Sequence, residues 1–233
     1  MINYPEAVLL DIGSNIGPHS LTVAAMEREV VVLDAVYYNL ALISMSHKMT
    51  NKGKVKILYN SISDKEGEEL YPYLEAQHSH MAGATYLVTR EQLDTANYKW
   101  EEVIGPPAVS VTTRDIFQQI EAKTIVIKID VEGHECKVRE SYSMSSIPDS
   151  QALPPYVLDR STGKFVPYIF MEWANLRLNR HHTCDNYKEF INSFTESGYI
   201  PHQPGSLVPV SLDTHTEWFD VVWIHKDAAK INV

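Results

Sequence analysis

The 233-residue chain contains few cysteines and no long apolar run, and these two absences exclude several classes of protein. Its two cysteines, Cys136 and Cys184, are too few for a disulfide framework and suit a reducing compartment. No apolar segment approaches the roughly 20 residues of a membrane-spanning helix, and no signal-like leader follows Met1. We therefore expect, for the chain as written, a cytoplasmic protein without a membrane segment. A targeting or anchoring segment ahead of Met1 would change that expectation.

The chain is also poor in positive charge. Its 20 basic side chains stand against 30 acidic ones, which gives a formal net charge of −10. Nucleic acids and anionic membranes are bound first through Lys and Arg contacts to phosphate, so neither is an expected partner. The 44% hydrophobic content is ordinary for a globular core, and we expect one domain over residues 1–233.

Most of the chain alternates β-rich apolar segments with helical ones, which predicts an α/β fold with a mainly parallel sheet. The expected strands cover residues 7–10, 30–34, 55–59, 124–130 and 168–172. The expected helices begin at Pro18 or cover residues 38–48 and 187–197. The closing segments 208–212 and 219–224 are too close together for a parallel crossover, so we expect them to pair antiparallel. Residues 68–114 show no sustained hydrophobic periodicity, and we expect them to form an insertion on the substrate side of the fold. Within it, segments 84–88 and 108–113 have the composition of strands.

The segment Leu9–Gly17 combines the end of a buried strand, a glycine-bearing turn and the start of a helix. It lacks the third glycine of a dinucleotide fingerprint and the Gly-Lys-Ser/Thr of a P-loop, so NAD and P-loop phosphoryl transfer are disfavoured. Asp34 ends the next strand 21 positions after Gly13, close to the spacing at which nucleotide folds place a carboxylate on the ribose. The loop and the acid together indicate a nucleoside-containing cofactor.

Four expected strands end in an acid: Asp11, Asp34, Asp130 and Glu172. Any one of them could be a helix cap or a solvated strand end. Ligands of open α/β sheets bind outside the carboxyl ends of the strands, so we expect the four acids to surround one crevice.

Several motifs, in order along residues 7–176, resemble the FkbM-type methyltransferases. They are Asp11-Ile-Gly-Ser-Asn-Ile-Gly17, the acid-ended strand at Asp34, Ser61-Ile-Ser-Asp64, Thr113-Arg-Asp115 and Ile127-Lys-Ile-Asp-Val-Glu-Gly-His-Glu135. The resemblance implies a Rossmann-like class I methyltransferase: a mainly parallel seven-stranded sheet with an antiparallel C-terminal hairpin and helices on both faces. It also implies S-adenosylmethionine as cofactor and O-methylation of a hydroxyl on a sugar, glycan or small metabolite.

Carried over by position, the resemblance also implies the cofactor-binding residues. The methionine part would lie on the loop that contains Asp11, Gly13, Ser14, Asn15 and Gly17. Asp34 would accept hydrogen bonds from the ribose, and Ser61 would lie beside the adenine. The chain departs from the family in two places. It has Asp34-Ala35 where family members commonly have Glu-Pro, and it has Arg114 where they have a leucine before the acid at Asp115.

Methyl transfer from a sulfonium needs alignment of the acceptor oxygen and removal of its proton. Asp130, Glu132 and His134 are the candidate catalytic residues, because they follow the strongest predicted strand. Glu132 could instead cap the next helix, and His134 could be exposed on it. Two rival functions stay open: a non-catalytic cofactor-binding module of the same fold, and, less favoured, a nucleotide-dependent oxidoreductase.

The histidine-containing clusters do not indicate a metal site. His78 with His80, and the group His181, His182, Cys184 and Asp185, have no recognised ligand spacing. We therefore expect no metal. Cys136 is expected to pack beside the strand at 124–130 rather than to react.

Overall fold

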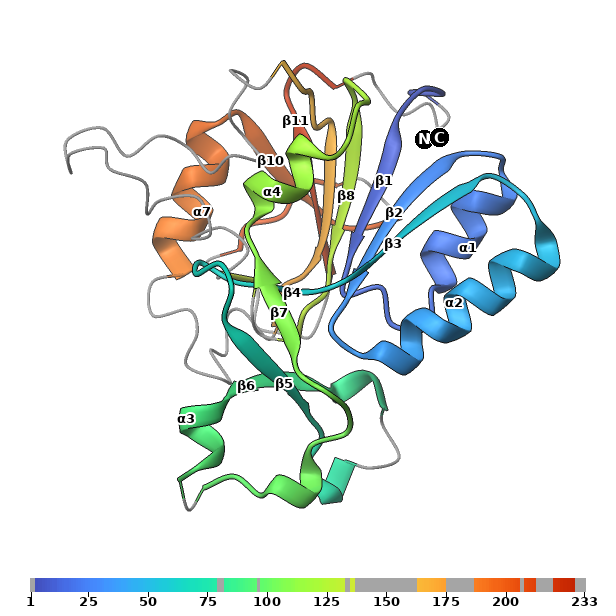
Figure 1. The fold of residues 1–233 in the computed structure, drawn as a ribbon. Coiled ribbons are helices and arrows are strands. Elements are labelled where there is room, and N and C mark those ends of the chain that lie inside the picture. The colour runs from blue at the N-terminus through green and yellow to red at the C-terminus, as the bar shows by residue number, and fades with distance from the viewer. Residues whose placement is uncertain are drawn as a thin grey trace.

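The fold is built on a seven-stranded sheet with the strand order β10-β11-β9-β8-β1-β2-β3 (Figure 1). The computed structural model describes residues 3–78, 82–95, 97–132, 135–136, 163–174, 187–205, 208–212 and 220–228. The strands are β1 (Val8–Ile12), β2 (Glu29–Asp34), β3 (Lys54–Tyr59), β8 (Ile125–Ile129), β9 (Tyr168–Glu172), β10 (Tyr199–His202) and β11 (Asp220–His225). The first five are parallel to one another, and β11 pairs antiparallel with both β9 and β10. This confirms the predicted Rossmann-like methyltransferase fold.

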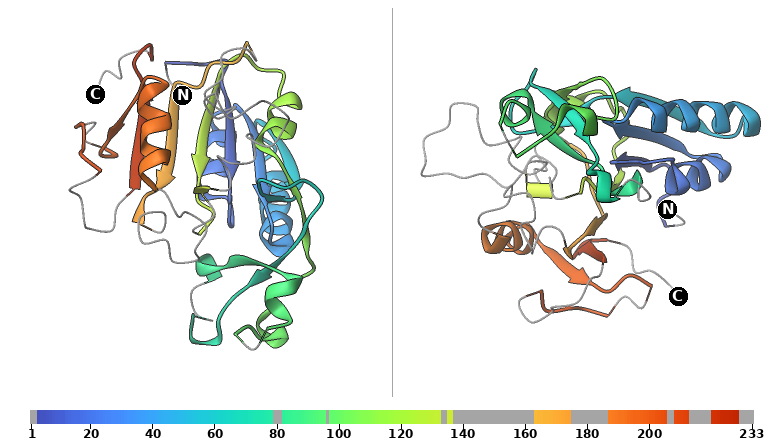
Figure 2. Two further views of the ribbon diagram at one scale, coloured as in Figure 1. Left: turned by 90° about the vertical axis from the view of Figure 1, so that its left-hand side faces the viewer. Right: turned by 90° about the horizontal axis from the view of Figure 1, so that it is seen from below.

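Helices cover both faces of the sheet, as predicted (Figure 2). On one face lie α1 (Pro18–Ala25) and α2 (Tyr37–Thr50), whose Ala24, Leu40 and Ile43 pack against the side chains of Leu9, Val30 and Val32. The other face carries α4 (Thr113–Gln118) and α7 (Tyr187–Glu196), and their buried aromatic and aliphatic side chains join Leu10, Ile127 and Ile169. Side chains alternate between the faces along each strand, so one continuous apolar strand supplies both cores.

The insertion forms a second, four-stranded sheet with the order β4-β7-β5-β6, which Figure 1 shows below the main sheet. Its elements are β4 (Ser61–Ile62), β5 (Glu69–Tyr73), β6 (Tyr86–Thr89), α3 (Arg90–Leu93) and β7 (Ala108–Val111). Three short 3-10 turns accompany them, at Ala76–His78, Ala82–Ala84 and Trp100–Glu102. The insertion has a small hydrophobic core of its own, which contains Tyr71, Tyr73 and Tyr86. The sequence predicted β6 and β7 within three residues, whereas β4, β5 and α4 were not predicted.

The closing hairpin is antiparallel as predicted, but its first strand was assigned to the wrong residues. The partner of β11 is β10, with Tyr199 opposite His225, and not the segment 208–212. Residues 208–210 instead fold back on the end of β10, where the N–H of Val210 donates to the carbonyl of Pro201 at 3.0 Å. Pro201 obscured β10 in the sequence, yet proline is tolerated there because β10 is an edge strand.

Cys136 is packed beside the main sheet, as predicted, with 3% of its surface exposed. It is also disulfide-bonded, which the count of only two cysteines did not predict. The sequence contains one other cysteine, Cys184, which lies outside the described residues. Disulfides persist in oxidising compartments, which is at odds with the reducing one that the cysteine count suggested.

None of the helices in the described ranges combines the length and the apolar character that crossing a membrane requires. The longest helix in the described part of the chain is α2, Tyr37–Thr50, which leaves Tyr38, Met45 and Met49 largely exposed. A helix of this kind packs against the sheet with one of its faces and exposes its other face to water.

Candidate active site

A cleft lies at the carboxyl ends of β1, β2 and β8, where the order of the sheet reverses. Such a switch point is the usual ligand site of an open α/β sheet. The main sheet, the connections at its strand ends and the start of α2 supply Gly13, Asn15, Leu33, Asp34, Ala35, Val36, Asn39, Asp130, Val131 and Glu132 to its walls. The second sheet and its connections supply Asn60, Ser61, Ile62, Gly83, Thr85 and Leu87. The insertion thus closes the cleft opposite the glycine loop.

Gly13 makes the sharp turn from β1 into the cleft, and only glycine fits there. Its φ is 72°, and a Cβ on it would stand 1.8 Å from the carbonyl oxygen of Asp130. The Gly13 N–H donates to the carbonyl of Leu33 at 2.9 Å, and the Asp130 N–H donates to the carbonyl of Ile12 at 3.0 Å. The loop after β1 is therefore held by the ends of both neighbouring strands.

Asp34 is tied to this loop by its carboxylate. One oxygen accepts from the N–H of Asn15 at 2.7 Å, and the other accepts from the N–H of Val36 at 2.8 Å and from the amide of Asn39 at 3.3 Å. Burial raises the pKa of Asp34 to about 6, although these three hydrogen bonds and the more distant charge of Lys128 act in the opposite direction. An acid with such a pKa changes charge just below neutral pH.

Ser61 and Gly83 stand on the insertion side of the cleft. Ser61 is buried and its hydroxyl donates to the carbonyl of Ala108 at 3.2 Å. A Cβ on Gly83 would lie 3.3 Å from the Nδ2 of Asn15, so the insertion comes close to the glycine loop. The free volume of about 120 Å³ is below the roughly 300–1,000 Å³ of ligand pockets. A nucleoside-sized ligand therefore has to widen the cleft on this side.

Lys128 connects the interior of the sheet with the cleft. Its ammonium donates to the carbonyl of Gly13 at 2.6 Å and lies 3.3 Å from Asp11 Oδ1 and 3.3 Å from Asp130 Oδ2. The Asp11 side chain is fully buried and also accepts from the hydroxyl of Ser20 at 2.5 Å. Lys128 thus compensates a buried charge and fixes both the glycine loop and the acid at the end of β8.

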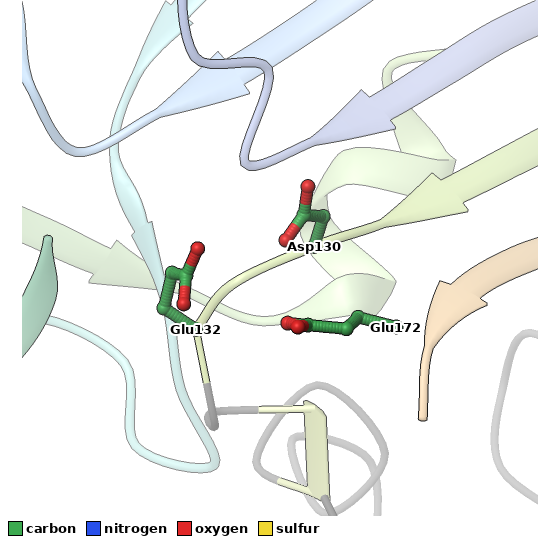
Figure 3. A group of neighbouring side chains, drawn as sticks. All are labelled: Asp130, Glu132 and Glu172. Carbon is green, nitrogen blue, oxygen red and sulfur yellow. The ribbon is translucent and has the colours of Figure 1, made fainter. Parts of the chain in front are cut away.

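Three acids, Asp130, Glu132 and Glu172, converge beyond the ends of β8 and β9 (Figure 3). One carboxylate oxygen of each lies within 4.8 Å of the others. Glu132 reaches this place with a φ of 51°, and Glu172 is 7% exposed. Carboxylate oxygens suit hard divalent cations, so among the described residues this is the group that could hold a metal.

The structure brings most of the predicted cofactor residues together. Gly13, Asn15, Asp34 and Ser61 all line the cleft, as do the candidate catalytic residues Asp130 and Glu132. Three predicted residues of the loop do not line it, namely Asp11, Ser14 and Gly17.

Each of these three has another environment. Asp11 is bound by Lys128 and Ser20, and Ser14 is buried with no hydrogen-bond partner for its hydroxyl among the described residues. Gly17 precedes α1 with a φ of 80°, and a Cβ on it would meet Ile43 of α2 at 2.7 Å. Of the four acids that were expected around one crevice, only Asp34 and Asp130 line the cleft, whereas Asp11 is buried and Glu172 lies beside Asp130 without lining it. His134 lies outside the described residues.

Sequence reasoning missed Lys128 and Asp220 and left Glu172 without a role. Burial raises the pKa of Asp220, and the nearby Asp130 carboxylate raises it further, while His19 and Lys128 lower it. A lysine inside the β-branched strand Ile125–Ile129 was the available signal, because a charge at a buried strand position needs a partner.

Comparisons with known proteins find similar solved structures, whereas no protein-family model and no curated protein matches the chain. Among solved structures, a precorrin-6y C5,15-methyltransferase from Geobacter metallireducens is 8% identical with a TM-score of 0.43 over 95% of this chain and 81% of its own. A TehB-like SAM-dependent methyltransferase from Corynebacterium glutamicum is 9% identical with a TM-score of 0.42, over 95% and 81%. A magnesium protoporphyrin IX methyltransferase from Synechocystis PCC 6803 with bound SAM is 8% identical with a TM-score of 0.40, over 96% and 72%. At these identities and TM-scores the matches carry no information on the function of this chain.

Proposed function

We propose that this chain is an S-adenosylmethionine-dependent methyltransferase of the FkbM type. The observation that carries the proposal is that Gly13, Asp34, Asp130 and Glu132 all line one cleft, at the point where the order of the main sheet reverses. The ribose would donate to Asp34, and the adenine would lie between the loop after β2 and Ser61. The methionine part would follow Asn15 and Gly13, which brings the sulfonium methyl to the acids.

The acceptor is a hydroxyl of a sugar, a glycan or a small metabolite. Asp130 is the proposed base, because its carboxylate is 41% exposed, stands at the end of the cleft and is oriented by Lys128. Its second oxygen would take the proton while the acceptor oxygen attacks the methyl in line with the departing sulfur. Glu132 assists by orienting the hydroxyl, and His134 is a further candidate.

Calorimetry with S-adenosylhomocysteine, S-adenosylmethionine and NAD tests the cofactor. We expect binding of the first two and none of NAD, because the loop lacks the glycine at which a pyrophosphate lies. Absence of binding for both methionine derivatives would refute the proposal.

Transfer of a labelled methyl group to hydroxylated metabolites and glycans tests catalysis. Asp130→Asn should abolish transfer while cofactor affinity stays close to that of the wild type. Glu132→Gln is the matched variant, since it removes one charge from the same acid group and should reduce transfer less. An Asp130→Asn variant with full activity would remove Asp130 as the base, and binding without any transfer would favour a non-catalytic module.

A further inference from the structure

A second cavity, of about 600 Å³, lies on the face of the main sheet that α1 covers. Thr22 and Val23 of α1 form one wall, and Val126 of β8 with Tyr168 and Phe170 of β9 form the floor. Phe170 is 40% exposed although it stands on a strand inside the sheet. Strands of such sheets are normally covered on both faces, so this surface is suited to a ligand.

The cavity is apolar over most of its length and charged at one end. Its charged residues are Lys128, Asp130, Glu172 and Asp220. Three carboxylates around a single ammonium disfavour an anionic ligand, because like charges repel in a partly dehydrated site. The shape and lining fit an uncharged molecule with an apolar body and a polar end.

The charged end is where the second cavity meets the cofactor cleft. Asp130 lines both cavities, and Glu172 of the second cavity lies within 4.8 Å of Asp130 and of Glu132 in the cleft. A group bound at the charged end of the large cavity therefore lies beside the acids at which the proposed function places the methyl group.

Resting on that proposed function, we propose that the second cavity binds the methyl acceptor. The acceptor is a small uncharged alcohol or phenol with an apolar body, rather than a free glycan. Its hydroxyl lies between Asp130 and Glu172, and its body lies over Val126 and Phe170. As the acceptor oxygen forms the new O–CH₃ bond, the S–CH₃ bond breaks, and its electron pair stays on the sulfur, which becomes a neutral thioether. The hydroxyl proton passes to Asp130.

Binding of n-alkyl β-D-glucosides, from propyl to heptyl, with glucose as the member without an alkyl chain, tests the inference. Titration calorimetry is performed on the full chain saturated with S-adenosylhomocysteine. If the apolar wall binds the alkyl group of the glucoside, each added methylene should lower Kd about fourfold. This gain in affinity should stop once the alkyl group is longer than the cavity.

Two exposed threonines on helices provide a matched pair of variants. The Thr22 hydroxyl donates to Pro18 O at 2.7 Å, and that of Thr50 donates to His47 O at 3.1 Å, but only Thr22 lines the cavity. Thr22→Trp should remove the dependence on chain length, whereas Thr50→Trp should keep it. Phe170→Ala provides an independent variant and should reduce the gain per methylene.

Three results would overturn the inference. Chain-length-independent binding in a protein that binds S-adenosylhomocysteine would place the acceptor elsewhere and leave the proposed function intact. Equal effects of Thr22→Trp and Thr50→Trp would do the same. A wild type that sediments as a dimer and a Thr22→Trp variant that sediments as a monomer would show that a second copy covers this face. Failure to bind S-adenosylhomocysteine would instead remove the proposed function, and the inference with it.

Discussion

Lys128 and Asp11 form an ion pair inside the main sheet, with 3.3 Å between Nζ and Oδ1. The Asp11 side chain is fully buried and that of Lys128 is 13% exposed. Asp11 therefore stabilises the site indirectly, by anchoring the lysine that binds the Gly13 carbonyl and the Asp130 carboxylate.

Lys128→Met should strongly destabilise the fold. It leaves the buried Asp11 carboxylate without its cation, and breaking a buried pair costs about 3–5 kcal/mol. Urea denaturation measures the free energy of unfolding, and Lys128→Met combined with Asp11→Asn should recover part of the loss. Lys56→Met is the control, because Lys56 is exposed on β3 and donates to Gln119 at 3.0 Å. A change of about 0.5 kcal/mol or less in both lysine variants would contradict this role of the ion pair.

Gly13→Ala should cost more stability than Gly67→Ala. Both glycines have a positive φ, of 72° and 79°, but only Gly13 has an atom in the way of a Cβ. Gly67→Ala should lose about 1–2 kcal/mol from the left-handed backbone alone. Gly13→Ala has to displace Asp130 as well, which should add at least about 1–3 kcal/mol and weaken cofactor binding. Equal losses in chemical denaturation would contradict the close approach of the two strand ends.

Cofactor affinity should rise with pH through the pKa of Asp34, which burial raises to about 6. The ionised carboxylate accepts hydrogen bonds from ribose hydroxyls more strongly than the protonated acid. Below that pKa the affinity for S-adenosylhomocysteine should fall, by up to about tenfold per pH unit, and it should level off above about pH 7. Calorimetry across this range measures the slope, and Asp34→Asn should flatten it. A slope that survives in Asp34→Asn would assign the titration to another group.

Gly83→Val should weaken cofactor binding without a comparable loss of stability. The new side chain would stand against Asn15 and oppose the widening that the narrow cleft requires. Overpacking of this kind costs about 1–3 kcal/mol, here in the free energy of binding. Gly105→Val is the control in the same insertion, since its Cβ meets only Pro72 at 3.7 Å. Unchanged affinity in Gly83→Val would mean that the cofactor does not pass between these walls.

The strands β1, β2, β8 and β9 of the main sheet were predictable because they are continuous apolar runs that end in an acid or beside one. The predicted strands Val30–Asp34 and Thr124–Asp130 are examples, and each boundary agrees with the structure within one residue. The hairpin was mispredicted because strand propensity favours Val208–Leu212, whereas pairing with β11 selects Tyr199–His202. Propensity describes one segment, and pairing depends on what the neighbouring strand offers.

The amino-acid sequence by itself determined the alternation of strands and helices, the glycine turn at Gly13 and the acids Asp34 and Asp130, because each depends on local backbone chemistry. Only the tertiary structure decided that Lys128 joins Asp11 to Asp130, that the insertion narrows the cleft, and that a second cavity meets the first at Asp130. These features join residues far apart in the chain, such as Gly13 and Lys128, 115 positions apart. Distances and burial across strands follow from packing, which no single segment encodes.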